Sequence, residues 1–238
     1  MPSNLWNGCW RGITPAGDVH RRARNVITPS GGIVRVKFPS RKNGRMIHLE
    51  GLLESDATYL FESSPRIVRY REQPETISYS DEAKLRRYTP DFELVLITGE
   101  QIYVEVKPTA SLQHQKVRNK LDRIAEHMRR NDMTFVILTD DVIRQEPRLA
   151  NLKWLCERAP RIHPTVDAIQ VALNNYRNCF PLSIATASTV LKANGLDPYS
   201  LLLAGQLRCS LEQSISEDTL IELEADNGWF FIAQEYGF

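Results

Sequence analysis

The segment 88–108, YTPDFELVLITGEQIYVEVKP, constrains the fold more than any other stretch of the chain. Two apolar runs, 92–97 and 102–106, are rich in β-branched and aromatic residues, which favour β-strands. A Thr-Gly-Glu loop separates the runs, and Gly99 suits the left-handed position of a three-residue hairpin loop. Because side chains alternate between the two faces of a strand, this hairpin has one apolar face. The residues expected on that face are Phe92, Leu94, Leu96, Ile102, Val104 and Val106.

Three charged residues share the opposite face of the predicted hairpin. Ile97 pairs with Gln101 in this register. Asp91 then lies opposite Lys107, and Glu105 lies next to them. Two carboxylates and an ammonium are costly to remove from water unless they are paired or bind a ligand. An ordinary ion triplet on a strand face is one explanation.

The other explanation is catalytic. Asp and Glu oxygens together suit Mg²⁺ or Mn²⁺. A lysine beside the ion can orient a water molecule and offset the charge that builds up on a phosphate. The pattern D…ExK is short, so it indicates metal-assisted phosphodiester hydrolysis only together with its strand context and its neighbours.

Charge is distributed unevenly along the 238 residues, although the net charge is only +1. Residues 1–160 hold 26 Lys+Arg against 20 Asp+Glu, whereas residues 161–238 hold 4 against 9. A basic front half is what phosphate contacts need, and an acidic rear half suits a protein partner better than a DNA backbone. Solvated surfaces would explain both values as well. No stretch approaches the roughly 20 apolar residues of a membrane span, and the four cysteines lack CxxC spacing, so we expect a cytoplasmic protein with reduced thiols.

The segment before the hairpin is expected to supply a strand, a basic loop and a helix. The strand is predicted at 33–38 and the loop at 39–45, where DNA contact and simple solvation are equally good explanations. The leucine spacing predicts a helix over 48–61 with one apolar stripe. Glu50 and Glu54 lie four residues apart on an adjacent face, and the pattern does not separate them as candidates to reach the site.

The segment after the hairpin predicts a helix over 112–130 and a buried strand over 134–140. A strand–helix–strand unit favours a mixed sheet covered by helices. Beyond residue 164, three helical patterns precede two candidate strands. This order suggests a small winged-helix domain, which can bind either DNA or a protein.

Four stretches together resemble the TnsA family, the endonuclease subunits of heteromeric bacterial transposases. They are FPSRKNGRMIHLEGLLESD (38–56), IVRYREQPETISY (67–79), RRYTPDF (86–92) and YVEVKP (103–108). The resemblance implies an α/β fold of the restriction-endonuclease-like PD-(D/E)xK type, with a mixed sheet flanked by helices and a small C-terminal helical or winged-helix domain. The expected regions are a basic N-terminal segment (1–31), a nuclease domain (32–158) and a partner-binding C-terminal domain (159–238).

The same resemblance implies a set of catalytic residues. The family's helix glutamate falls on Glu54, with Glu50 as the rival, and its metal-binding aspartate falls on Asp91. Its last acidic position falls on Glu105 and its lysine on Lys107. Asp91, Glu105, Glu54 and the backbone carbonyl of Val106 would hold one or two Mg²⁺ ions, with Mn²⁺ able to substitute.

The resemblance also implies substrates and partners. The substrate would be double-stranded DNA at transposon ends, cut at the 5′ strand ends in the bacterial cytoplasm. The partners would be a DDE-type transposase (TnsB-like) and an AAA+ ATPase (TnsC-like) that contacts the C-terminal domain, with no membrane partner. A stand-alone restriction or repair nuclease and a non-catalytic DNA-binding scaffold are the alternatives. The residues expected to contact DNA are Arg41, Lys42, Arg45, Arg71 and Gln73.

Overall fold

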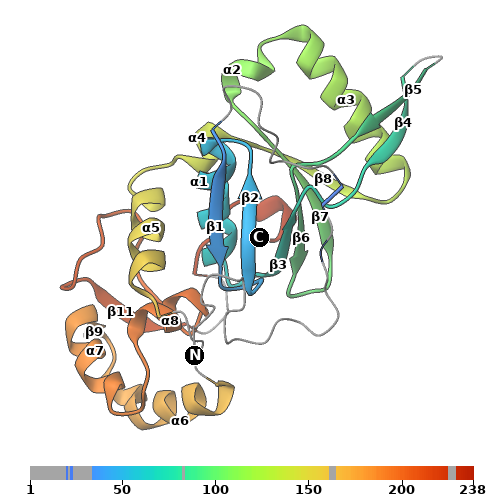
Figure 1. The fold of residues 1–238 in the computed structure, drawn as a ribbon. Helices are drawn as coiled ribbons and strands as arrows, with labels where there is room; N and C mark the ends of the chain where they lie inside the picture. Colours follow the sequence, from blue (N-terminus) through green and yellow to red (C-terminus); the bar gives the residue numbers. More distant parts are fainter. Residues whose placement is uncertain (1–19, 21, 24–33, 82–83, 161–164, 225–228) are drawn as a thin grey trace, which may run out of the picture.

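A four-stranded mixed sheet lies at the centre of the chain (Figure 1). The computed structural model describes residues 20, 22–23, 34–81, 84–160, 165–224 and 229–238, so the expected N-terminal segment 1–31 lies almost wholly outside the described residues. The strand order is β3-β6-β7-β8, with antiparallel neighbours except for the parallel pair β7 and β8. The strands are β3 (Ile67–Glu72), β6 (Phe92–Leu96), β7 (Gln101–Lys107) and β8 (Thr134–Thr139).

Helices cover both faces of this sheet, as predicted. The buried side chains of helix α1 pack against one face of the sheet, which is formed in part by the apolar residues of the 88–108 hairpin. Helix α3 forms the crossover between β7 and β8 and covers the opposite face with Leu121, Ile124 and Met128. The remaining helices of this part are short or follow β8. The bounds are α1 (Leu52–Ser63), α2 (Thr109–Leu112), α3 (Gln115–Arg130), α4 (Asp140–Ile143) and α5 (Arg148–Arg158).

Two further hairpins flank the central sheet. One consists of β1 (Val36–Ser40) and β2 (Arg45–Leu49), and the other of β4 (Ile77–Asp81) and β5 (Lys84–Tyr88). The β1–β2 hairpin corrects the predicted helix 48–61, because His48 and Leu49 pair with β1 and the helix begins only at Leu52. Gly51 separates the two elements in an extended conformation. Leu52, placed in the predicted apolar stripe, is 57% exposed.

The hairpin of β6 and β7 has the predicted faces but a different register. Val95 pairs with Gln101, where Ile97 was expected, so the ladder is displaced by two residues. The N–H of Leu96 donates to the carbonyl of Glu100, and the loop is therefore Ile97-Thr98-Gly99. Gly99 has φ +87° at the last loop position, which is where a type I turn with a left-handed third residue requires glycine. A displacement of two leaves every side chain on its predicted face.

The C-terminal elements comprise three helices and a small antiparallel sheet with the strand order β10-β11-β9. The carboxylate of Asp197 accepts a hydrogen bond from the N–H of Ser200 and caps α8, which begins at Pro198. Gly195 has φ +68° just beyond α7, as expected for a helix-terminating glycine. The bounds are α6 (Val166–Tyr176), the 3₁₀ turn η1 (Arg177–Cys179), β9 (Leu182–Ser183), α7 (Ile184–Lys192), α8 (Pro198–Leu203), β10 (Leu207–Arg208), β11 (Leu220–Leu223) and the 3₁₀ turn η2 (Gln234–Tyr236).

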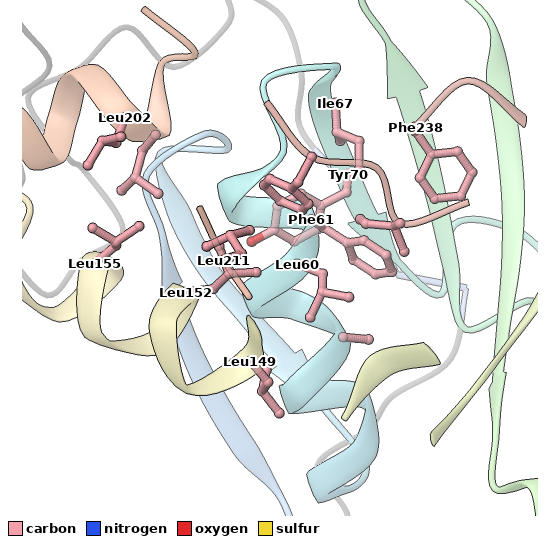
Figure 2. Close-up of a cluster of buried hydrophobic side chains, with 14 of the residues drawn as sticks. Leu60, Phe61, Ile67, Tyr70, Leu149, Leu152, Leu155, Leu202, Leu211 and Phe238 are labelled. Atoms are coloured by element: carbon pink, nitrogen blue, oxygen red, sulfur yellow. The ribbon is translucent and has the colours of Figure 1, made fainter. Parts of the chain in front are cut away.

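One hydrophobic cluster runs through both parts of the chain (Figure 2). In its centre Phe61 packs edge-on against Phe92, with ring centroids 5.1 Å apart. The cluster continues across the expected domain boundary at residue 158, and it includes the fully buried Phe238. No helix among the described residues is long and apolar enough to cross a membrane. Buried members from α5 onwards include Leu149, Leu152, Leu155, Leu202, Leu211 and Phe238.

Candidate active site

Asp91, Glu105 and Lys107 converge at one end of the central sheet, where β6 begins and β7 ends. The Nζ atom of Lys107 lies 2.7 Å from Oε1 of Glu105 and 3.6 Å from Oδ2 of Asp91. The backbone N–H of Val106 donates to Oδ2 of Asp91 at 2.8 Å. The structure thus brings the three predicted side chains together, even though Asp91 is not opposite Lys107 in the ladder. The last pair of the ladder is Phe92 and Val104, which brings Asp91 level with Glu105.

Glu54 in the first turn of α1 is the third carboxylate of the site. Its Oε2 atom accepts a hydrogen bond from the backbone N–H of Glu50 at 2.9 Å. Burial raises the pKa of Glu54, and the carboxylates of Glu50 and Glu105 raise it further, while the Glu50 N–H and the Lys107 ammonium oppose them. Glu54 therefore interacts with both Lys107 and Glu105. Which of Glu54 and Glu50 completes the site stays a prediction.

Negative charge exceeds positive charge in this cluster, with three carboxylates beside one ammonium. Burial, followed by repulsion from Glu105, raises the pKa of Asp91 from 3.8 to about 8, although Lys107 and the Val106 N–H act in the other direction. Burial opposes the charge of Lys107, yet Asp91, Glu105 and Glu54 together raise its pKa. A cation would relieve the repulsion that these shifts express.

The available donors fit a hard cation. Asp91, Glu105 and the Val106 carbonyl all offer oxygen atoms, and Mg²⁺ commonly uses one or two carboxylates and retains several water molecules. Among the described residues, no three His, Cys, Asp or Glu side chains are grouped closely enough to hold an ion between them. The Lys107 ammonium instead bridges Asp91 and Glu105, and it also lies 3.2 Å from the Val106 carbonyl oxygen.

Tyr88 also belongs to this cluster and was not among the residues predicted from the sequence. Its hydroxyl donates to Oε2 of Glu105 at 2.5 Å, so the two oxygens of Glu105 are divided between Tyr88 and Lys107. Burial and the Glu105 carboxylate raise the pKa of Tyr88 strongly, which keeps the hydroxyl a hydrogen-bond donor. The available signal was its position in RRYTPDF, three residues before Asp91 and at the end of a strand that the sequence analysis did not predict.

Gln73 supports the backbone at Asp91. Its N–H donates to the carbonyl of Asp91 at 2.9 Å, and its own carbonyl accepts from the N–H of Ala23 at 3.0 Å. Gln73 is buried and has φ +45°, a conformation that non-glycine residues seldom adopt. Arg71, two residues earlier, pairs with Glu93 on the adjacent strand at 3.5 Å. DNA contact by Gln73 or Arg71 stays a prediction.

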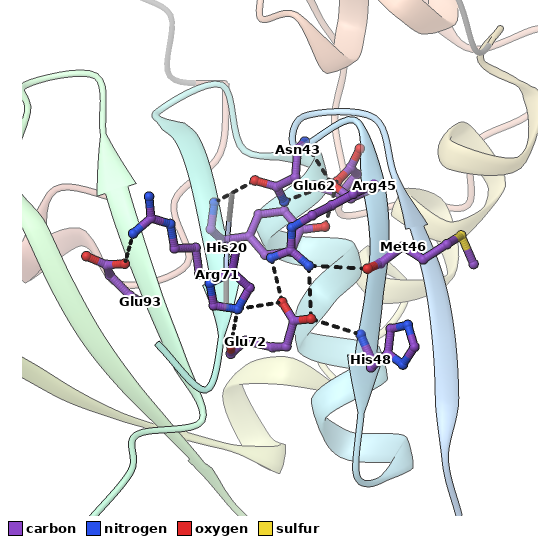
Figure 3. A network of polar contacts seen from close by, with 11 residues as sticks. His20, Asn43, Arg45, Met46, His48, Glu62, Arg71, Glu72 and Glu93 are labelled. Atoms are coloured by element: carbon purple, nitrogen blue, oxygen red, sulfur yellow. Dashed lines mark hydrogen bonds and ion pairs between the residues drawn. The ribbon is translucent and has the colours of Figure 1, made fainter. Parts of the chain in front are cut away.

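Arg45 is engaged inside the protein (Figure 3). Its guanidinium donates to both carboxylate oxygens of Glu72, at 2.9 and 2.6 Å. Glu72 is only 2% exposed, and it also accepts from the backbone N–H of His48. The Nε2–H of the His20 ring donates to the backbone carbonyl of Glu72 at 2.8 Å. This network connects β2, β3 and residue 20.

Arg41 and Lys42, in the turn between β1 and β2, are also held internally. Arg41 donates to the carbonyl of Cys156 at 2.6 Å. The Lys42 ammonium donates to the carbonyls of Phe61, at 2.8 Å, and of Ser64. Burial lowers the pKa of Lys42 to about 8, with Glu62 acting in the opposite direction. The basic loop therefore uses these charges to pack against α1 and α5, and DNA contact by Arg41, Lys42 or Arg45 stays a prediction.

Comparison with known proteins identifies the domain that carries this cluster. Residues 64–140 match the family model described as TnsA-like endonuclease N terminal, which is about a third of the chain. The matched range contains Asp91, Glu105 and Lys107 and begins after Glu54. No curated protein matches the chain. Over residues 64–140 the chain is therefore similar to the N-terminal domain of TnsA-like endonucleases.

Proposed function

We propose that this chain is the endonuclease subunit of a heteromeric transposase and hydrolyses DNA phosphodiester bonds at the 5′ strand ends of a transposon with the help of Mg²⁺. The observation that carries the proposal is the convergence of Asp91 and Glu105 on Lys107, within 3.6 Å and 2.7 Å, inside the segment that matches the TnsA-like model. Carboxylates and a lysine at one end of a mixed sheet suit phosphate chemistry that forms no covalent enzyme intermediate.

Each side chain has a distinct role in this proposal. Asp91 and Glu105, with the Val106 carbonyl and Glu54, would hold one or two Mg²⁺ ions, and Mn²⁺ would substitute. Bound Mg²⁺ supplies Lewis acidity that neutralises developing charge on a phosphate. On metal binding, the Lys107 ammonium would be freed from its bridging position to orient the attacking water. Tyr88 would fix the orientation of the Glu105 carboxylate by its hydrogen bond.

The proposed partners are a DDE-type transposase (TnsB-like), which would cut and join the 3′ ends, and an AAA+ ATPase (TnsC-like). We assign the ATPase contact to the C-terminal elements. Their order of helix, strand, two helices and two strands, with the small sheet ordered β10-β11-β9, supports a winged-helix arrangement. The excess of acidic residues, 9 against 4 basic ones in 161–238, favours a protein over DNA as the ligand of this region.

The test is strand-specific nicking of transposon-end DNA with Mg²⁺, in the presence of the proposed DDE-type transposase partner. Wild-type protein should nick the 5′ strand ends. Asp91→Asn should lose cleavage by several orders of magnitude, because one carboxylate supports several functions of the metal. Asp218→Asn, the same change at an exposed carboxylate near β11, should retain full activity.

Three results would contradict the proposal. Unimpaired cleavage by Asp91→Asn would show that Asp91 is not a required metal ligand. Efficient cutting of plasmid DNA with Mg²⁺ and no partner would favour a stand-alone nuclease. Absence of Mg²⁺ and Mn²⁺ binding in titration calorimetry would favour a non-catalytic scaffold.

A further inference from the structure

A basic groove lies between the β4–β5 hairpin and helix α3. Figure 1 shows these elements side by side, at the end of the molecule opposite the C-terminal helices. The groove has a volume of about 690 Å³. Its lining contains five cationic side chains and one carboxylate. The lining residues are Tyr79, Asp81, Arg86, Arg87, Lys116, Asn119, Lys120 and Arg123.

Asp81 positions two of the cations across the groove. Its carboxylate pairs with Arg86 of the neighbouring strand at 3.2 Å and with Arg123 of α3 through its other oxygen. Arg87 and Lys116 are exposed and form no hydrogen bond or ion pair with any residue that the structure describes. The Asp81 carboxylate thus holds two of the cations in place. Arg87 on the hairpin and Lys116 on α3 remain available to contact an anionic ligand.

The groove is connected to the active site by one side chain. The Lys120 ammonium lies 5.6 Å from the ring centroid of Tyr88, and the hydroxyl of the same tyrosine donates to Glu105. Tyr88 is the last residue of β5, so the hairpin wall leads directly to the catalytic carboxylates. A polyanion in the groove would therefore extend to Asp91 and Lys107.

We propose that this groove binds the phosphate backbone of double-stranded DNA on one side of the scissile bond and directs one strand to the active site. The inference rests on the proposed function, because cutting DNA requires a surface that holds the duplex. The cations are spread along a helix and a hairpin, which suits a row of phosphates better than a single small anion. These contacts read no base edges, so the groove supplies affinity and orientation, and sequence choice comes from elsewhere.

The test measures the salt dependence of DNA binding without cleavage. A fluorescein-labelled random duplex is titrated by anisotropy in EDTA, over a series of salt concentrations. Each lost phosphate contact should reduce the slope of log K against log salt by about 0.9. The double variant R87A/K116A should therefore lower the slope by nearly two and weaken binding to all sequences alike.

A matched variant controls for net charge. R177A/K192A removes two exposed cations from the C-terminal elements and should leave the slope at the wild-type value. Unchanged thermal unfolding of both double variants establishes that they are folded. An equal slope for R87A/K116A and wild type, or an equal loss in R177A/K192A, would overturn the groove proposal. Loss of binding to an acidic peptide but not to DNA would overturn it as well.

The two proposals fail in different ways. If the chain cuts DNA with Mg²⁺ but R87A/K116A binds duplex with the wild-type slope, the groove is wrong and the nuclease assignment stands. If R87A/K116A lowers the slope but no divalent ion supports cleavage by wild-type protein, the groove stands and the nuclease assignment is wrong.

Discussion

Replacing Asp91 by asparagine should make the metal-free protein more stable at pH 8. The folded chain binds a proton at Asp91 with a pKa of about 8, against an ordinary value of 3.8, because burial and Glu105 disfavour the ionised form. The folded state holds this proton more tightly than the unfolded chain does. Metal-free wild type therefore loses stability as the pH rises from about 4 to about 8, while Asp91→Asn has no such loss.

The expected difference in unfolding free energy follows from the pKa shift of Asp91 and from the exposed fraction of its side chain. One pKa unit corresponds to about 1.4 kcal/mol, so a shift from 3.8 to about 8 corresponds to an upper value of about 6 kcal/mol. Asp91 is 14% exposed, and solvent screening reduces the expected difference to about 3 kcal/mol at pH 8. The difference should nearly vanish at pH 4. An asparagine oxygen can still accept the Val106 N–H, so the local backbone is preserved.

Urea denaturation in EDTA at several pH values measures this difference. Adding Mg²⁺ at pH 8 should then stabilise wild type and leave Asp91→Asn unchanged. Glu72→Gln is the control, because this buried carboxylate is paired with Arg45; its replacement should destabilise the protein by about 3–5 kcal/mol. A lower stability of Asp91→Asn than of wild type at pH 8, or an advantage that does not grow with pH, would contradict the raised pKa of Asp91.

Three other outcomes are expected. Tyr88→Phe removes the hydrogen bond to Glu105 but keeps the ring, and should lower Mg²⁺ affinity or cleavage rate by about 10–100-fold; a rate and affinity equal to wild type would deny the tyrosine a positioning role. Mg²⁺ binding at pH 7 should release about one proton per ion, because Asp91 is largely protonated in the metal-free state; calorimetry in two buffers of different ionisation enthalpy detects it, and identical heats would contradict it. Phe238→Ala should cost about 3–5 kcal/mol of folding free energy because this ring is fully buried, and Phe238→Leu should cost less; urea denaturation measures both, and a loss below 1 kcal/mol would show that the ring adds little to the core.

The hairpin shows what alternation can and cannot predict. The strand pattern identified the buried face correctly and gathered Asp91, Glu105 and Lys107 on the other face. The register was wrong by two residues, because a Thr-Gly-Glu loop and an Ile-Thr-Gly loop are both compatible with one glycine and differ only in where the turn begins. Because a shift of two residues leaves each side chain on the same face of the strand, the three charged residues still lie together.

Other parts of the site lay beyond local sequence patterns. The leucines at 49 and 52 have helical spacing, yet Leu49 belongs to β2, because pairing with β1 outweighs local propensity. The inward direction of Lys42 and Arg45 depends on carbonyls and carboxylates that are distant in sequence. Tyr88 acquires its role only when β7 lies beside it, so no pattern within β5 could reveal that role.

The continuous apolar cluster has a consequence for cooperativity. The leucines of α5 contact α1 on one side and α8 on the other, so the elements before and after α5 cannot separate without exposing apolar side chains of both. We therefore expect a single unfolding transition for the whole chain. We expect a fragment truncated after residue 158 to expose Leu152 and Leu155 and to aggregate.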